Sequence, residues 1–314
     1  MVEHARLRGV RVMVEFDMPG HAASWCKGYP EVCPSPDCPQ PLNVASNRTF
    51  ELIDGLLAEI AGSNSSSNNI SKNSIRTSAS ASASAVTSAT PGVFKDHFVH
   101  LGGDEVNTAC WSSTPTIAAW MAARNMSADG DDAYAYFVKR VAEIALSHGK
   151  RPVQWSEVYD HFKNTLPKEV IIHIWKRVTN VTEPLAGGYN VILNVGYDDL
   201  SWYLDNLDTD WAHVYRQEPC CGVPDHLCPL ILGGQGEMWG ESVDASDLER
   251  TVWPRLAAVA ERLWSPRHLN DTADAHQRIA EFRCLLNRRG VTAAPVDNMV
   301  ARNAPPGPGS CALQ

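Results

Sequence analysis

The stretch FVHLGGDEVN, residues 98–107, joins a short apolar run to two glycines and two adjacent acids. The apolar run predicts a buried strand, and the glycines mark its end. Adjacent carboxylates repel each other, and burial makes the repulsion more costly. Asp104 and Glu105 therefore either begin a helix, where the positive end of the helix dipole favours acids, or take part in chemistry.

Similar apolar runs recur along the chain and alternate with helical patterns. The predicted strands are residues 10–16, 98–102, 151–155, 170–175, 190–195 and 230–234. These runs are continuous rather than alternating, which is typical of parallel strands covered on both faces. The predicted helices include residues 47–61, 113–125, 131–149 and 247–265. The pattern indicates an α/β fold with a parallel sheet.

A (β/α)8 barrel is favoured over an open doubly wound sheet, because no glycine-rich phosphate loop follows the first strand. A barrel needs eight strands and the sequence predicts six, so two strands are hidden or the barrel is incomplete. The predicted catalytic barrel domain covers residues 1–300. Within it, the serine- and asparagine-rich residues 62–92 predict a disordered insertion, and residues 301–314 form a C-terminal tail.

Composition excludes several classes of protein. The 314 residues carry a net charge of −9, and the sequence pI is about 5.6, which argues against nucleic-acid binding. No apolar stretch is long enough to predict a membrane span. Nine cysteines and six glycosylation sequons favour a lumenal (lysosome or vacuole) or secreted location. Because residues 1–12 lack a signal peptide's apolar core, we expect any signal to lie upstream of this chain.

Acids and large aromatic residues follow successive predicted strands. In a parallel barrel the carboxyl ends of the strands carry the chemistry, so these side chains are expected at one rim. Aromatic faces and carboxylates are typical of a carbohydrate site, and glycosidic cleavage uses one protonated acid and one ionised stabiliser. The candidate residues are Asp17, His21, Asp104, Glu105, Trp155, Trp175, Tyr203, Asp205, Trp239 and Glu241.

Taken singly, each candidate also has a structural explanation. A tryptophan is often a core residue, and a lone histidine is often a hydrogen-bonded structural one. A metal site built from His21, His100, Asp104 and Glu105 is an alternative, but the set lacks a tight ligand spacing such as HExxH. Recurrence at the same end of successive strands is what favours a functional interpretation.

Five separated motifs then point to one family. HLGGDEV, EFDMPGHAASW, WYLD, GGQGEMWGE and WPRLAAVAERLW resemble the β-N-acetylhexosaminidases of glycoside hydrolase family twenty, in the eukaryotic lysosomal and secreted branch. The resemblance covers nearly all of residues 1–300 outside the insertion. It implies an exo-glycosidase that removes terminal non-reducing GlcNAc or GalNAc from oligosaccharides or glycoconjugates. It implies no metal or cofactor, and a possible homodimer.

The resemblance also implies catalytic roles. Glu105 matches the general acid that protonates the leaving oxygen. Asp104 matches the residue that orients the 2-acetamido group, whose carbonyl is itself the nucleophile and forms an oxazoline intermediate. Tyr203 matches a hydroxyl that binds the acetamido oxygen, and His21 matches a histidine that assists the acid.

Further positions match residues that bind the sugar or stabilise the domain. Cys284 and Cys311 match a C-terminal disulfide, and Cys110 would pair with the Cys26–Cys38 region. Cys220, Cys221 and Cys228 depart from the animal pattern of the family and are left unassigned. The residues implied to bind substrate are Trp155, Trp175, Asp205, Trp239, Glu241 and Asp17.

One departure from the family pattern lies at the start of the chain. Residues 3–21 match the family's third barrel strand and the helix before it. The first two strands, with an arginine that anchors the sugar, would precede Met1. A truncated, inactive sugar-binding remnant of the same family is therefore the alternative hypothesis.

Overall fold

The computed structural model describes residues 1–62, 92–176, 180–194, 202–205, 209–241 and 243–297. The chain forms two compact units, residues 1–171 and 172–314. The predicted insertion and C-terminal tail lie almost wholly outside the described residues. Among the helices that are described, none is both long and apolar enough to cross a membrane.

The first unit contains two parallel strands, β1 (Phe98–His100) and β2 (Arg151–Trp155), with Phe98 opposite Arg151. Short 3-10 turns lie at Pro30–Val32 and Lys163–Thr165. Its helices are α1 (Val2–Arg6), α2 (Trp25–Gly28), α3 (Asn47–Ala61), α4 (Ala109–Ser113), α5 (Pro115–Ala122), α6 (Asp131–Ser147) and α7 (Ser156–Phe162).

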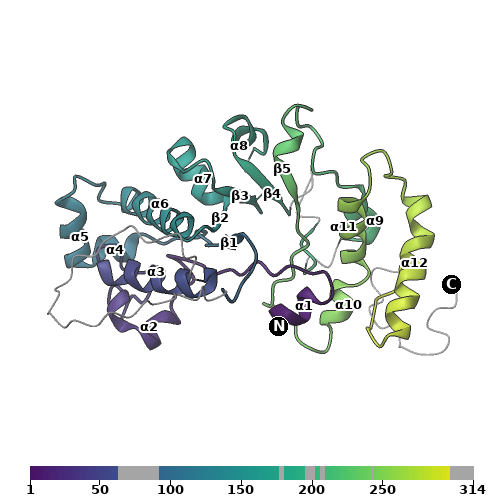
Figure 1. Cartoon of the computed structure of the whole chain (residues 1–314), viewed down its shortest axis with the longest axis horizontal. Coiled ribbons are helices and arrows are strands. Elements are labelled where there is room, and N and C mark those ends of the chain that lie inside the picture. Colours follow the sequence, from purple (N-terminus) through teal and green to yellow (C-terminus); the bar gives the residue numbers. More distant parts are fainter. Residues whose placement is uncertain (63–91, 177–179, 195–201, 206–208, 242, 298–314) are drawn as a thin grey trace, which may run out of the picture. The chain divides into compact units, whose positions relative to one another are not determined.

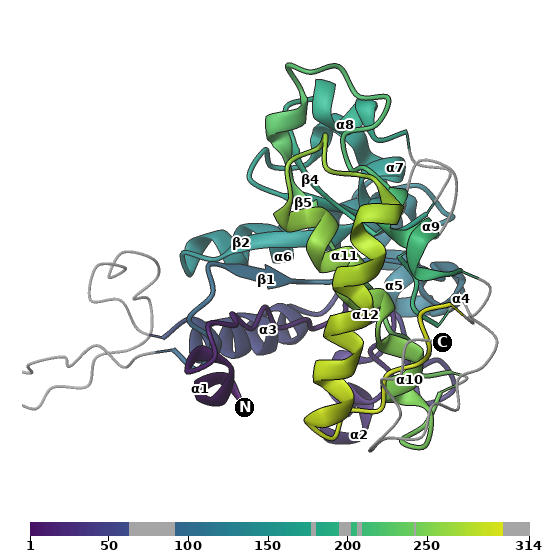
Figure 2. The same ribbon diagram turned by 90° about the vertical axis from the view of Figure 1, so that its right-hand side faces the viewer.

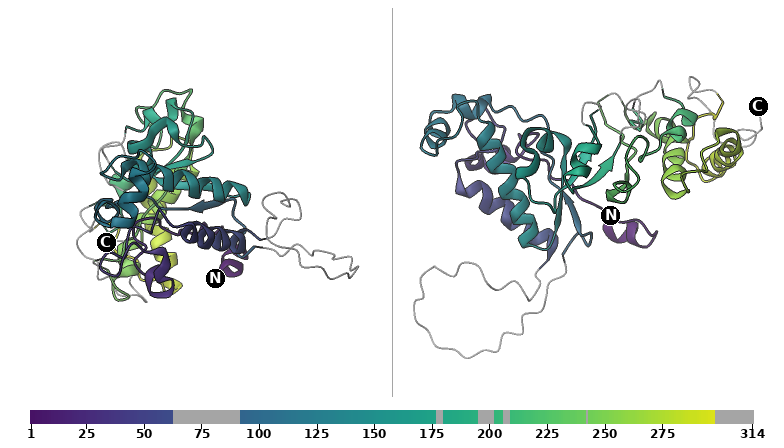
Figure 3. Two further views of the ribbon diagram at one scale, coloured as in Figure 1. Left: turned by 90° about the vertical axis from the view of Figure 1, so that its left-hand side faces the viewer. Right: turned by 90° about the horizontal axis from the view of Figure 1, so that it is seen from above.

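Helices α3 and α6 pack side by side and supply much of the first core (Figures 1 and 3). Both were predicted from apolar residues at helical spacing, which places those residues on one face. Phe50 of α3 and Phe137 of α6 are buried, with their ring centroids 5.2 Å apart. Two acids, Asp131 and Asp132, lie in the first turn of α6, where the helix dipole favours them.

The predicted strand at residues 10–16 is wrong in extent. The chain there runs parallel to β1, but only Glu15 forms a bridge, with His100. His100 donates its N–H to the Val14 carbonyl oxygen at 2.9 Å, and Phe16 donates to the His100 carbonyl oxygen at 3.0 Å. Met18 also donates its N–H to the Leu101 carbonyl oxygen at 3.1 Å, so residues 14–18 lie beside β1 and the turn after it without building a full strand.

The second unit contains β4 (Asn190–Leu193) and β5 (Ile231–Gly234), paired in parallel, and most of β3 (Ile171–Ile174). Asn194 donates its N–H to the Ile174 carbonyl oxygen at 3.1 Å. A 3-10 turn lies at Cys228–Leu230. The helices are α8 (Thr182–Ala186), α9 (Trp211–Arg216), α10 (Leu248–Val252), α11 (Arg255–Trp264) and α12 (Thr272–Arg288).

The core of the second unit lies among α9, α11 and α12, which pack together (Figure 2). The single helix predicted over 247–265 is instead two helices, α10 and α11, because Pro254 lacks an N–H and disfavours helical backbone at Trp253. Strand β5 also departs from expectation. It is only half buried, and Leu232 is exposed, so it is not covered on both faces.

Candidate active site

The turn after β1 depends on two glycines with left-handed backbone. Gly102 has φ +65° and Gly103 has φ +98°, a region that side-chain-bearing residues rarely adopt. A Cβ on Gly102 would overlap the Asp17 carboxyl group, and one on Gly103 would lie 2.6 Å from Cγ2 of Val158. The glycines therefore let the chain turn tightly against Asp17 and deliver the acid pair directly after the strand.

The two acids have different surroundings. The Asp104 side chain is 13% exposed and the Glu105 side chain is 55% exposed. Nε2 of His21 lies 3.5 Å from Oδ2 of Asp104 and 3.6 Å from Oε2 of Glu105. Oδ1 of Asp104 is buried and has no hydrogen-bond partner among the described residues. One acid is thus a buried acceptor, and its neighbour faces solvent.

Two residues of this cluster have left-handed backbone. His21 and Glu105 have φ of +49° and +48°, although neither is glycine. Left-handed backbone costs such residues about 1–2 kcal/mol, and it persists where surrounding structure enforces it. Gly20 contributes to that enforcement, because a Cβ there would lie 3.1 Å from the Asp104 carbonyl oxygen. The turn that carries His21 is therefore packed directly against the acid pair.

Asp17 lies behind Asp104. Its Oδ1 accepts a hydrogen bond from the Gly103 N–H at 3.0 Å. Burial raises the pKa of Asp17 to about 9, and the charge of Asp104 and a hydrogen bond to Asp104 add to the rise. The hydrogen bond from the Gly103 N–H opposes it. Asp17 is therefore a neutral carboxyl group at neutral pH and can donate its proton to Asp104.

The four residues of the alternative metal site do not come together in the structure. Ligand atoms of Asp17, His21 and Asp104 lie within 4.8 Å of one another, but that group excludes His100 and Glu105. His100 instead lies with Nδ1 3.2 Å from Oε1 of Glu15 and accepts the Gly102 N–H at 3.1 Å.

Trp155 is anchored by a residue that sequence reasoning missed. Its indole N–H donates to Oε1 of Glu15 at 3.0 Å, and its ring centroid lies 4.5 Å from that of His100. Trp155 is 2% exposed, so its ring is buried in this structure. Burial alone would raise the pKa of Glu15, but the interactions of Glu15 with His100 and Trp155 outweigh burial and hold that pKa below its usual range.

In the second unit, Tyr203 and Trp239 meet at a buried carboxylate. Glu237 follows β5, is 3% exposed, and accepts the Trp239 indole N–H at 3.1 Å through Oε2. Tyr203 is buried, with Glu237, Asn194 and Trp239 as polar neighbours. Burial first, then Glu237, raises the pKa of Tyr203 far above its ordinary value, so the phenol stays neutral. Sequence analysis selected Glu241 from this segment and missed Glu237.

Asp205 and Glu241 are neighbours in the second unit. Oδ1 of Asp205 is buried and lacks a hydrogen-bond partner within the described part of the chain. Burial raises the pKa of Asp205; the nearby charge of Glu241 adds to the rise, and Arg255 opposes it. Glu241 itself is exposed. The remaining aromatic candidate, Trp175, is half buried, with Nζ of Lys176 4.3 Å from its ring centroid.

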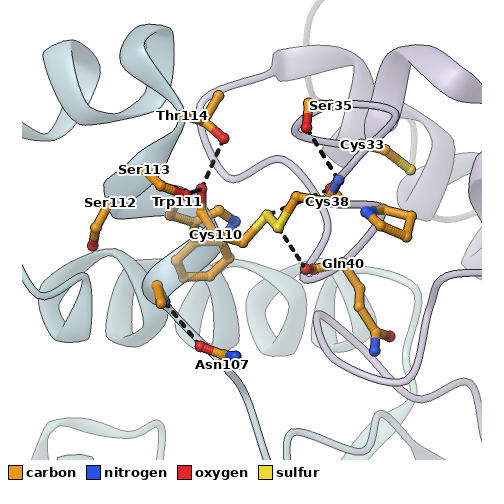
Figure 4. The surroundings of a disulfide bond; sticks show 12 residues. Cys33, Ser35, Cys38, Gln40, Asn107, Cys110, Trp111, Ser112, Ser113 and Thr114 are labelled. Atoms are coloured by element: carbon orange, nitrogen blue, oxygen red, sulfur yellow. Dashed lines mark hydrogen bonds between the residues drawn. A yellow bond between two sulfur atoms is a disulfide. The ribbon is translucent and has the colours of Figure 1, made fainter.

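Three disulfides occur among the described residues. Cys110 bonds to Cys38, which ties α4 to the segment that follows His21 (Figure 4). Around this bond, Ser35 accepts the Cys38 N–H at 3.1 Å, and Thr114 donates to the Cys110 carbonyl oxygen at 2.7 Å.

The other two bonds close short loops. They join Cys26 to Cys33 and Cys220 to Cys228, a pair that the sequence did not assign. Cys311 lies outside the described residues, so the predicted Cys284–Cys311 bond stays a prediction.

Comparison with known proteins gives one consistent result. The model of the glycosyl hydrolase family 20 catalytic domain matches residues 1–267. Beta-hexosaminidase 3 of Arabidopsis thaliana is 42% identical over 317 residues, covering 100% of this chain and 52% of that protein. Beta-hexosaminidase subunit beta of Homo sapiens is 33% identical over 309 residues, covering 94% of this chain and 49% of that protein. The chain thus spans about half the length of these curated relatives.

Solved structures agree on the fold. The exo β-N-acetylglucosaminidase of Vibrio harveyi, solved with N-acetylglucosamine, matches with a TM-score of 0.75 and 22% identity, covering 95% of this chain and 45% of that one. The chitobiase of Flavobacterium johnsoniae matches with a TM-score of 0.71. The predicted fold class, α/β with the parallel strands of a (β/α)8 barrel, is confirmed.

Proposed function

Since the chain belongs to glycosyl hydrolase family 20, we propose that its protein is an exo-acting β-N-acetylhexosaminidase. It would remove terminal non-reducing GlcNAc or GalNAc from oligosaccharides or glycoconjugates. The observation that carries the proposal is the contrast between the acids, with Asp104 buried and Glu105 exposed. A hydrolase that uses its substrate's acetamido group needs two acids serving different atoms of one sugar.

Asp104 is assigned to the acetamido group. Its buried Oδ1 lacks a partner among the described residues and is suited to accept the acetamido N–H. That hydrogen bond would aim the acetamido carbonyl oxygen at the anomeric carbon. As the glycosidic bond breaks, the carbonyl oxygen bonds to the anomeric carbon and forms a cationic oxazoline, whose charge the carboxylate stabilises. Asp17, held as a neutral donor, would keep Asp104 oriented.

Glu105 is assigned to proton transfer. Its exposed carboxyl group would donate a proton to the leaving glycosidic oxygen, then accept one from the water that opens the oxazoline. His21 lies within 3.6 Å of both acids and would assist this exchange. The left-handed backbone at both residues supports a built site, since strain of this kind gathers at functional positions.

The second unit supplies the proposed sugar-binding side chains. Tyr203, kept neutral, would donate its hydroxyl proton to the acetamido oxygen. Trp175 and Trp239 would contact the acetamido methyl group and the sugar ring. Asp205 has a buried oxygen without a partner among the described residues, and with Glu241 it would accept hydrogen bonds from sugar hydroxyls.

A comparison of two substrates tests the proposal. The protein should hydrolyse an aryl N-acetyl-β-D-glucosaminide and leave the matching aryl β-D-glucoside intact, because the glucoside lacks the acetamido nucleophile. Asp104→Asn should reduce the rate by about 10²–10³-fold, a loss typical of one charge-stabilising group. Equal hydrolysis of both substrates would refute acetamido participation. Binding of N-acetylglucosamine without turnover would select the sugar-binding remnant, and loss of activity in EDTA would select the metal alternative.

Location is a further part of the proposal. Three disulfides support maturation in an oxidising compartment, since cytosolic proteins rarely keep such bonds. We therefore place the protein in a lumenal or secreted setting. Mass analysis of the protein from its native cells, with and without reduction, would contradict this if all cysteines proved reduced.

A further inference from the structure

We infer that Glu237 is a positioning residue that fixes the Tyr203 hydroxyl and the Trp239 indole, and so sets the length of N-acyl group that the site accepts. The inference rests on the proposed function, which assigns these two side chains to the acetamido group. Glu237 itself contacts no substrate in this account. It acts only through its two neighbours.

The side-chain contacts of Glu237 divide between its two oxygens. Oε2 accepts the Trp239 indole N–H at 3.1 Å. Oε1 accepts a hydrogen bond from Nε2 of Gln235 at 3.1 Å and lies 3.8 Å from Nε2 of His173. The side chain is 2% exposed. A carboxylate held by donors on both oxygens has little freedom to rotate, so the indole that donates to it is held as well.

The main chain of Glu237 also pairs with the segment that contains Tyr203. Glu237 donates its N–H to the Trp202 carbonyl oxygen at 2.9 Å, and Leu204 donates its N–H to the Glu237 carbonyl oxygen at 2.7 Å. These bonds pair Tyr203 with Glu237 as a parallel bridge. Tyr203 and Glu237 therefore lie side by side on two paired segments of main chain.

The Tyr203 hydroxyl completes the arrangement. Tyr203 lies beside Glu237 in the bridge, and after burial the charge of that carboxylate is the main reason why the pKa of Tyr203 is raised. The hydroxyl itself has no hydrogen-bond partner among the described residues, so its proton stays available to the acetamido oxygen. Because the Trp239 indole is held by the same carboxylate, one group sets the positions of both proposed acetamido contacts.

The burial of this carboxylate favours a functional explanation. Burying a charge is unfavourable even when it is hydrogen-bonded, and an apolar replacement of similar volume is often equally stable. A buried acid between two substrate-contact residues is better explained by a requirement for fixed geometry.

A series of aryl β-glucosaminides carrying N-acetyl, N-propionyl and N-butyryl groups tests the inference. In Glu237→Ala, kcat/KM for the N-acetyl substrate should fall by about 10–100-fold, the scale of a small misplacement of reacting groups. The ratio of N-propionyl to N-acetyl kcat/KM should rise by about 10-fold, because the released indole and phenol no longer limit the acyl group. Glu237→Gln keeps an oxygen for the Trp239 N–H and should recover much of the parent's acyl selectivity.

Glu218→Gln is the matched control. Glu218 belongs to the same unit, and its Oε2 lies 3.3 Å from Nη2 of the buried Arg262. Loss of that ion pair should lower the melting temperature without changing the acyl ratio. If Glu237→Ala also lowered the melting temperature while the acyl ratio stayed at the parent value, Glu237 would be a purely structural residue and the inference would be overturned.

A second measurement does not depend on activity. Spectrophotometric titration of the tyrosines, with Tyr203→Phe to identify the Tyr203 signal, should show that phenol ionising at lower pH in Glu237→Ala than in the parent. An unchanged titration would overturn the contact itself. If the parent hydrolysed no glucosaminide at all, the proposed function would fail, and the titration would still decide whether Glu237 holds Tyr203.

Discussion

Replacing Gly102 by alanine should damage both stability and activity. At φ +65° an alanine costs about 1–2 kcal/mol relative to glycine, because left-handed backbone crowds its Cβ. That Cβ would also overlap the Asp17 carboxyl group. Moving Asp17 breaks its hydrogen bond with the Gly103 N–H, a loss of about 1 kcal/mol. The free energy of unfolding should therefore fall by about 2–3 kcal/mol.

Gly149→Ala separates the two contributions. Gly149 follows α6 with φ +71°, nearly the same backbone, but a Cβ there would have no atom within 4 Å. This variant should show only the backbone cost of about 1–2 kcal/mol and should keep its activity. The difference between the variants isolates the contact between residue 102 and Asp17.

Urea unfolding and hydrolysis of an aryl N-acetyl-β-D-glucosaminide measure both effects. Gly102→Ala should be less stable than Gly149→Ala by about 1 kcal/mol and should lose at least about 10-fold in rate, because Asp17 can no longer support Asp104. Equal stability of the two variants, with full activity in Gly102→Ala, would refute the close packing of the glycine turn on Asp17.

Two further perturbations follow from the first unit. The pKa of Asp17 is raised to about 9 in the folded chain, whereas the unfolded chain releases this proton above about pH 4. The stability that this group contributes is therefore complete below about pH 4 and declines as the pH rises toward 9. Between about pH 5 and pH 8, the urea midpoint of the parent should therefore fall more than that of Asp17→Asn; parallel pH curves would contradict the assignment. Removing the Cys38–Cys110 bond, which spans 72 residues, should cost about 4 kcal/mol, against about 2–3 kcal/mol for Cys26–Cys33, which spans 7. Thermal unfolding of the two cysteine-to-alanine pairs measures this order, and a reversed order would contradict it.

The sequence predicted the strands more reliably than their limits. Residues 151–155 coincide with β2, because an apolar run bounded by charged residues fits one strand. Residues 10–16 have the same pattern, yet they form only one bridge, since pairing depends on a neighbouring strand that local pattern does not specify. The break at Pro254 was readable from the sequence, but the strong apolar periodicity on both sides obscured it.

The sequence likewise predicted only part of the candidate site. Motif spacing placed Asp104 and Glu105 after a strand, and the structure brings them within reach of His21. Sequence could not reveal that Glu237, rather than Glu241, is the buried acid of its segment, because its burial follows from the bridge to Tyr203. The same holds for Glu15, whose contacts with His100 and Trp155 join residues far apart in the chain.

The most direct test of the proposed function is hydrolysis by Glu105→Gln of two aryl N-acetyl-β-D-glucosaminides, one with a good leaving group and one with a poor one. The glutamine cannot protonate the leaving oxygen, so kcat/KM for the poor leaving group should fall by about 10²–10⁴-fold. The loss should be much smaller for the good leaving group, which departs without protonation. Equal activity of parent and variant on the poor leaving group would contradict the role of Glu105 and, with it, the proposed mechanism.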